Sequence, residues 1–202
     1  MSKSNGNGRP DSVGTPEPIA IIGIGCLLPQ ARDLQAYWSN IKNGVDAITE
    51  IPESHWRPED YFDADPKVPD RTYGKRGGFL PPVDFDPLAF GIPPNALEAT
   101  DTSQLLGMLV AERALDDAGY GNGRVFDRDR VGVILGVTGA LELVGPLIGR
   151  LGHPHWRNAL REAGIGAAQT EEIVERIADS YVPWQENSFP GLLGNVVAGR
   201  IT

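Results

Sequence analysis

The residues best suited to chemistry include a single cysteine that closely follows two glycines. Gly23, Gly25 and Cys26 lie near the end of the apolar run EPIAIIGIGCLLP. Glycines can bring a backbone close to a phosphate, and a thiol becomes a nucleophile when a neighbouring base activates it. The run therefore suggests three roles: a nucleotide-binding loop, a catalytic thiol, or a buried strand with its turn.

The glycine pair does not complete a dinucleotide-binding fingerprint. Leu28 stands where the third glycine of G-x-G-x-x-G is needed, and Pro29 follows where a helix should continue. No acidic residue closes a second strand about twenty residues further on, where such a site needs one. The sequence also has no phosphate-binding loop and no G-x-S-x-G motif. A nucleotide-binding α/β domain is the weaker alternative.

The histidines and aspartates do not have the spacing of a metal site. His153 and His155 flank a proline, without a clear third ligand. Asp63 and Asp65 resemble the start of a calcium loop, but Lys67 stands where an oxygen ligand is needed and no glycine follows it. One cysteine permits neither an internal disulfide nor a cysteine-based zinc site. The sequence predicts no metal ligands.

The elements that would position these residues alternate between strands and helices, which predicts an α/β fold. Residues 18–25 and 130–137 are apolar on both faces, which predicts two buried strands. Cys26 would then be a core residue beside the first strand. Asp33 is expected to cap an amphipathic helix, and Asp101 to cap an apolar, largely buried one. Shorter helices are predicted at 141–150, at 156–164 and after a capping Thr170.

Composition and charge indicate where in the cell the protein is expected and which classes of partner are excluded. Residues 1–16 contain almost nothing apolar and are predicted to be a disordered leader. The formal net charge of −9 argues against nucleic acid or an anionic membrane as the main partner. The apolar run 19–28 is too short to span a bilayer and lacks a signal-peptide pattern. With one cysteine, these features predict a cytoplasmic protein.

Four stretches carry motifs in a characteristic order. They read EPIAIIGIGCLLPQARDLQAYWSNIKNGVDAITEIP, GKRGGFLPPVDFDPLAFGIPPNALEATDTSQLLGMLVAERALDDAGY, RVGVILGVTGALEL and NSFPGLLGNVVAGRIT. Together they resemble the β-ketoacyl synthase domain of modular polyketide and fatty-acid synthases, over residues 17–202. The stretch 141–186 is most similar to synthases of the polyunsaturated fatty acid and related iterative polyketide type. The resemblance implies a thiolase fold, a layered αβαβα architecture, here as its N-terminal portion only.

The resemblance also implies a decarboxylative Claisen condensation. In the family, an active-site cysteine carries an acyl group as a thioester. Malonyl on the phosphopantetheine of an acyl carrier protein loses CO2 and attacks that thioester. Two histidines stabilise the enolate. The family places all three residues after the segment that AGRIT matches here, so this chain is expected to stop before the nucleophile. Cys26 matches an early structural position. The resemblance therefore implies no catalytic residue and an inactive 202-residue piece.

Six residues match family positions near the acyl pocket. They are Val137, Thr138, Gly139 and Ala140 in the turn after the second strand, and Ser188 and Phe189 in a loop that reaches toward the pocket of a partner protomer. The alternative is that these are ordinary turn and packing residues. The resemblance implies a homodimer, an acyl carrier protein and adjacent synthase domains as partners, and no cofactor in this domain. A non-catalytic binding or scaffold protein of thiolase-like ancestry is the alternative function.

Overall fold

The computed structural model describes residues 18–121, 124–138 and 142–202. The elements in chain order are α1 (Leu34–Asn43), β1 (Thr49–Glu50), α2 (Pro58–Tyr61), β2 (Arg76–Gly77), the 3₁₀ helix η1 (Pro94–Ala99), α3 (Thr102–Asp117), the 3₁₀ turn η2 (Arg128–Arg130), α4 (Val144–Arg150), α5 (His153–Glu162), α6 (Ala167–Asp179), α7 (Ser188–Leu192) and α8 (Val196–Ile201). The predicted leader, residues 1–16, lies outside the described residues, as do Gly139 and Ala140.

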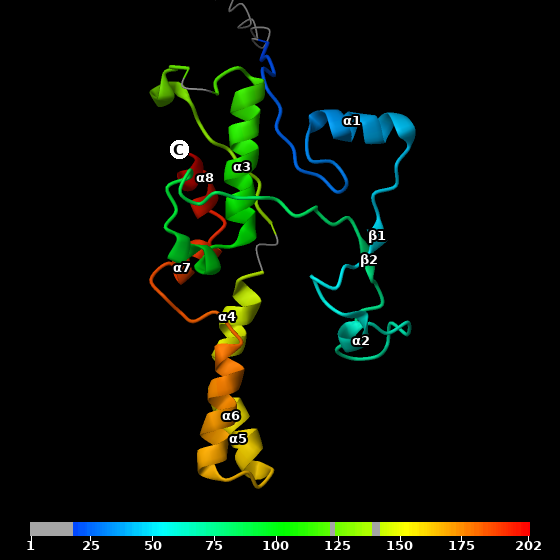
Figure 1. Ribbon diagram of the computed structural model, residues 1–202, viewed down its shortest axis with the longest axis vertical. Helices are drawn as coiled ribbons and strands as arrows, with labels where there is room; N and C mark the ends of the chain where they lie inside the picture. Colours follow the sequence, from blue (N-terminus) through cyan, green and yellow to red (C-terminus); the bar gives the residue numbers. More distant parts are fainter. Residues whose placement is uncertain (1–17, 122–123, 139–141) are drawn as a thin grey trace, which may run out of the picture.

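Helix α3 is the longest helix among the described residues, and the other parts of the chain extend from its sides and from one end (Figure 1). Helices α7 and α8 lie beside it, and the extended N-terminal segment follows another side. Helix α1, the β1–β2 ribbon and α2 form an arm to one side, while α4, α5 and α6 extend beyond one end of α3. No helix within the described ranges is long and apolar enough to cross a membrane.

Asp101 caps α3 as predicted, because its side chain accepts a hydrogen bond from the backbone N–H of Ser103 at 3.0 Å. Met108 joins Ile92 and Ala96 in the buried core. The core is extended by the half-buried side chains of Phe85, Phe90, Leu97, Leu105 and Ile201. The prediction that the whole helix is largely buried is wrong, since Leu115 is 40% exposed. The described residues therefore leave part of the α3 surface exposed.

The predicted strand at 18–25 is extended backbone that pairs with no other strand among the described residues. Ile19 and Ile21 are 95% and 83% exposed, so the prediction of a buried strand is wrong here. A strand needs a partner strand to satisfy its backbone groups. The apolar composition of 18–25 cannot supply that partner.

The same segment instead packs its two glycines on α3. A Cβ atom on Gly23 would overlap the carbonyl oxygen of Ala114, and one on Gly25 would overlap that of Val110. The backbone N–H of Ile24 donates to Asp117 Oδ2 at 2.8 Å. The glycines therefore permit close approach to a helix, which is a packing role and not a phosphate-binding one.

The predicted strand at 130–137 fails for the same reason. Arg130 ends the turn η2, and residues 131–138 form no regular element. Ile134 is 97% exposed. The sheet in the described residues is the antiparallel ribbon β1–β2, in which Thr49 pairs with Gly77.

Helix α1 forms as predicted from its cap and its glycine. Asp33 Oδ1 accepts the N–H of Ala36 at 2.8 Å, and Gly44 closes the helix in the left-handed region at φ 62°. The apolar stripe is present, but it is not covered: Trp38 is 58% exposed and Ile41 is 51% exposed.

Helices α5 and α6 form an antiparallel hairpin that projects away from α3 (Figure 1). Thr170, Val174 and Ala178 bury one face of α6. Thr170 was expected to cap this helix, but Gly166 precedes its first residue and Thr170 lies inside it, fully buried. Helix α5 likewise begins at His153, three residues before the predicted start.

Candidate functional site: the junction of α3, α7 and α8

The second half of the predicted site begins at α7. Ser188 is fully buried, and its Oγ accepts the backbone N–H of Gln185 at 3.0 Å. Phe189 is 63% exposed and is therefore free to contact a ligand or another protein segment. The two neighbouring residues therefore differ in role: the serine holds the start of α7, and the phenylalanine presents an apolar surface.

Gly191 lets α7 lie directly on the end of η1. A Cβ atom at this position would overlap the carbonyl oxygen of Ala99. The N–H of Asp101 donates to the Gly191 carbonyl at 2.9 Å, which ties α7 to the start of α3. A side chain larger than hydrogen has no space here.

Gln104 connects α3 to the turn between α7 and α8. Its side chain is 1% exposed. Its Nε2 donates to the carbonyl oxygens of Pro190, Gly191 and Leu193 at 2.9, 2.7 and 3.1 Å. Its Oε1 accepts from Arg200 Nε at 2.5 Å. One buried amide therefore joins three helices.

Asp101 adds a second polar link in the same place. Its Oδ1 accepts from Ser103, and its Oδ2 accepts the backbone N–H of Leu143 at 3.4 Å. The Thr100 hydroxyl donates to the Ala96 carbonyl at 2.8 Å. These buried polar groups are all hydrogen-bonded, as buried polar groups must be, and the bond to Leu143 reaches a segment far along the chain.

One predicted site residue, Val137, contacts the turn that follows α7. A Cβ atom on Gly194 would lie 3.0 Å from Val137 Cγ1, so the end of the 131–138 segment contacts the turn after α7. Val137 is 41% exposed, and Thr138 is also exposed. Sequence reasoning missed Gln104 and Gly191. The available signal was a polar amide directly before the apolar stretch 105–111.

Cys26 and His55, two of the residues first considered for chemistry, lie in separate places and contact neighbouring groups. Cys26 is half-buried, and its carbonyl accepts from Arg113 Nη1 at 3.2 Å. His55 lies edge-on to Phe79 with 5.0 Å between ring centroids. Among the described residues, no three side chains of His, Cys, Asp or Glu gather closely enough to hold a metal ion.

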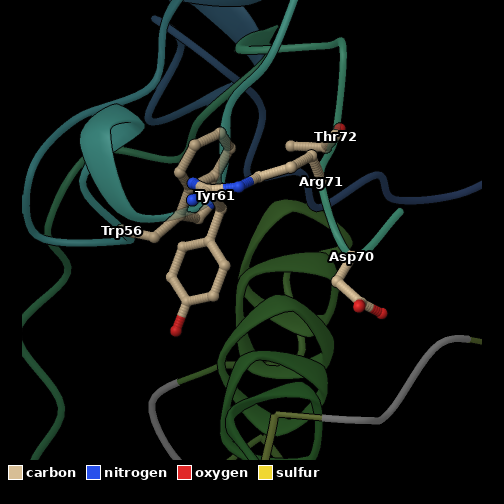
Figure 2. A pocket seen from close by; sticks show the side chains of 5 residues that line it. All are labelled: Trp56, Tyr61, Asp70, Arg71 and Thr72. Carbon is tan, nitrogen blue, oxygen red and sulfur yellow. The ribbon is translucent and has the colours of Figure 1, made fainter. Parts of the chain in front are cut away.

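An open pocket of about 690 Å³ lies in the arm, near α2. It is lined by Trp56, Tyr61, Asp70, Arg71 and Thr72 (Figure 2). Arg71 Nη1 donates to the carbonyls of Asp60 and Glu59 at 2.5 and 3.3 Å, so its guanidinium fastens the loop to α2. The Asp70 carboxylate points away from the aromatic pair (Figure 2). The polar groups do not converge on a ligand position, as they do in most binding sites.

Residues 16–202 match the family described as "Beta-ketoacyl synthase, N-terminal domain". The chain belongs to this family, which makes it the N-terminal portion of an α/β fold of the thiolase-like class. This confirms the predicted family and fold class.

Similar proteins are much longer than this chain. A polyunsaturated fatty acid synthase polypeptide from Thraustochytrium sp. is 32% identical over 201 residues, which are 100% of this chain and 7% of that polypeptide. Polyketide synthase ThaG from Burkholderia thailandensis is 43% identical over 124 residues, which are 61% of this chain and 2% of that synthase. The alignment with the Thraustochytrium synthase includes 141–186, in agreement with the predicted similarity of this stretch.

A solved ketosynthase from module 6 of the bacillaene synthase of Bacillus subtilis 168 is 37% identical to this chain, with a TM-score of 0.45. The alignment covers 50% of this chain and 17% of the ketosynthase.

Proposed function

We propose that this chain is the N-terminal part of a β-ketoacyl-[acyl-carrier-protein] synthase that elongates acyl chains by decarboxylative Claisen condensation. The observation that supports this most directly is the family match over residues 16–202. The alignment of the whole chain with a polyunsaturated fatty acid synthase supports a role in polyketide or fatty-acid biosynthesis. The parent enzyme would be an acyltransferase.

The reaction would use residues that lie outside this chain. The acyl group would be held as a thioester on a cysteine of the complete domain. Malonyl on the phosphopantetheine of an acyl carrier protein would lose CO2, and the resulting enolate carbon would attack the thioester carbonyl. The C–S bond would then break, leaving a free thiolate and a β-ketoacyl carrier protein. Two histidines would stabilise the enolate.

This chain would contribute part of the wall of the acyl pocket. Phe189 is the strongest candidate, since it is large, apolar and 63% exposed. Val137 lies against the turn at Gly194, and Thr138, Gly139 and Ala140 continue the chain from it. Ser188 is buried and would support this wall, without touching the acyl chain.

The partners follow from the same reaction. An acyl carrier protein would deliver both substrates, and neighbouring synthase domains would act before and after condensation. A second copy of the chain would complete a homodimer and its pocket. The domain itself would need no cofactor, and the enzyme would work in the cytoplasm.

The decisive experiment combines mass with activity. The protein is isolated from its native source, its intact mass is measured, and it is incubated with an acyl thioester and malonyl-carrier protein. We expect a mass far above 21.8 kDa and a β-ketoacyl product. A native mass near 21.8 kDa without product would instead support a binding or scaffold protein. The 202-residue piece is the control, and an acyl adduct on its Cys26 would contradict the proposal.

A further inference from the structure

We propose that Gln104 is a positioning residue that fixes the α7–α8 turn and thereby sets the acyl-chain selectivity of the condensing site. The selectivity part rests on the proposed function. The positioning part rests on the hydrogen bonds of one buried amide.

The amide supplies donors at the end of a very short helix. Helix α7 spans Ser188–Leu192, and the carbonyls of Pro190 and Gly191 each accept one backbone N–H, from Leu193 and Asp101, which leaves a second lone pair on each oxygen. Nε2 of Gln104 lies within 3.1 Å of three carbonyl oxygens in this region, those of Pro190, Gly191 and Leu193. An amide has two N–H groups, so at least one of them is shared. Gln104 thus supplies additional donors to the carbonyls at the end of α7 from a different helix.

Arg200 fixes the orientation of the Gln104 amide. Its Nε donates to Oε1 of Gln104 at 2.5 Å, so the amide oxygen must face α8 and the nitrogen must face the turn. The reversed amide would place its oxygen against three carbonyl oxygens. The position of Arg200 on α8 and the carbonyls after α7 are therefore coupled through one side chain.

Helices α3 and α8 are also in contact through apolar groups. A Cβ atom on Gly107 would lie 2.9 Å from Val197 Cγ1, so the Val197 side chain packs directly on the backbone of α3. A shift of α8 would separate Arg200 from Gln104. The network therefore specifies a single position for the turn, which is the role that fully satisfied buried polar groups can have.

The turn carries the candidate pocket wall. The amide binds the carbonyl of Leu193, which follows Phe189 closely in the chain, and Gly194 touches Val137 just after it. A movement of this turn would shift the exposed phenyl ring relative to Val137. Simple space filling would not need an amide, since Met has a similar size and carries no donor. The polar side chain of Gln104 therefore holds the turn in place through its hydrogen bonds.

The test uses the full-length protein with its complete ketosynthase domain, and two substitutions. Gln104→Met keeps the volume and removes the donors. Gln104→Glu keeps an acceptor for Arg200 but points an oxygen at the three carbonyls. Arg176→Met is the matched control, because Arg176 pairs with Glu172 on the exposed face of α6.

Two readouts separate positioning from selectivity. Hydrogen exchange of the backbone amides at 188–196 should become about tenfold faster in Gln104→Met and faster still in Gln104→Glu. The ratio of kcat/KM between the preferred acyl thioester and one about four carbons longer should fall about tenfold. Exchange of the α5–α6 hairpin should stay unchanged in both variants, which shows that they are folded. The Arg176→Met control should change neither exchange at 188–196 nor the ratio.

Each outcome decides one part of the proposal. Unchanged exchange at 188–196 in folded Gln104→Met would overturn the positioning role. Faster exchange with an unchanged acyl ratio would overturn the selectivity role. If the wild-type protein condenses no acyl thioester, the proposed function fails and the selectivity role fails with it. The exchange measurement would still decide whether Gln104 holds the turn.

Discussion

Individual glycines mark the places where backbones of separate elements touch. Gly191 lies against the carbonyl of Ala99, and Gly25 lies against that of Val110. Neither contact involves a left-handed backbone at the glycine, since the positive φ values are at other positions. The missing side chain is what matters, because it allows an approach that any Cβ atom would block. Such residues set the geometry of the site without performing chemistry.

We expect Gly191→Ala to destabilise the domain by roughly 3 kcal/mol, because the methyl group must displace the backbone of η1 and not a flexible side chain. Gly199→Ala in α8 is the control. A Cβ atom there meets nothing within 4 Å, so this change should raise the free energy of unfolding by about 0.5–1 kcal/mol, because alanine favours a helix more than glycine does. Thermal unfolding of the complete domain measures both. Equal melting temperatures for the two variants would contradict this reading of Gly191.

Gly25→Ala tests the contact between the N-terminal segment and α3. The added methyl group would push the segment away from Val110, which we expect to cost roughly 1–3 kcal/mol. Hydrogen exchange at Ile24, whose N–H donates to Asp117, should increase. Gly136→Ala is the matched control, because a Cβ atom there meets nothing within 4 Å. If Gly25→Ala left this N–H as protected as Gly136→Ala does, the close contact would not exist.

At the scale of elements, a helix could be predicted from sequence where residues close to its own end stabilise it. The caps at Asp33 and Asp101 act on N–H groups within three residues, so both helices could be predicted from sequence. Thr170 looked like another cap, yet its helix begins earlier and buries it. A cap-like residue inside an amphipathic stripe is equally compatible with the helix interior.

Elements that need distant partners could not be predicted in the same way. The apolar runs at 18–25 and 131–138 have strand composition, but strand formation depends on hydrogen-bonded neighbours that composition does not reveal. The role of Gln104 was also hidden, because its partners lie 86 to 96 residues further along the chain. The predicted turn at Val137 and the loop at Ser188 were recognised by resemblance. The contact of Val137 with Gly194, in the turn that follows α7, is visible only in the structure.

The α5–α6 hairpin should depend on pH through Glu171. The hydrogen bond from Arg157 is the main cause that lowers the pKa of Glu171 below its ordinary value of 4.5, with Arg161 adding to it. A lowered folded pKa means that this stabilisation is present above pH 4.5 and is lost as the pH falls through the lower folded value. The effect is small because Glu171 is accessible to solvent.

Glu171→Gln should therefore remove part of the acid sensitivity of the hairpin. Helicity and hydrogen exchange of α5 and α6, followed below pH 4.5, should change less in this variant than in the wild type. Glu172→Gln is the control, since Glu172 pairs with the exposed Arg176 four residues on. Identical acid profiles for the Glu171 and Glu172 variants would show that the Arg157 contact does not contribute to the acid sensitivity of the hairpin.

At the scale of the whole molecule, apolar groups are exposed along the two extended segments and on α1. Ile19, Ile21 and Ile134 are 95%, 83% and 97% exposed, and Trp38 is 58% exposed. Unpaired strands with apolar side chains are templates for pairing with other chains. The rest of a ketosynthase domain would cover such surfaces, in line with a family match to an N-terminal domain.

The 202 residues alone should therefore aggregate or remain partly unfolded in dilute solution, despite a net charge of −9. Size-exclusion chromatography and a thermal melt followed by circular dichroism test this, and we expect large species and a broad transition. Replacing Ile19, Ile21 and Ile134 by Lys should reduce the size of those species, because charges on unpaired strands oppose edge-to-edge pairing. Lysines on the exposed face of α6, at Ala168 and Gln169, should not. A monomeric elution with a sharp cooperative melt would mean that the chain completes its own core, and the extended segments would then need another explanation.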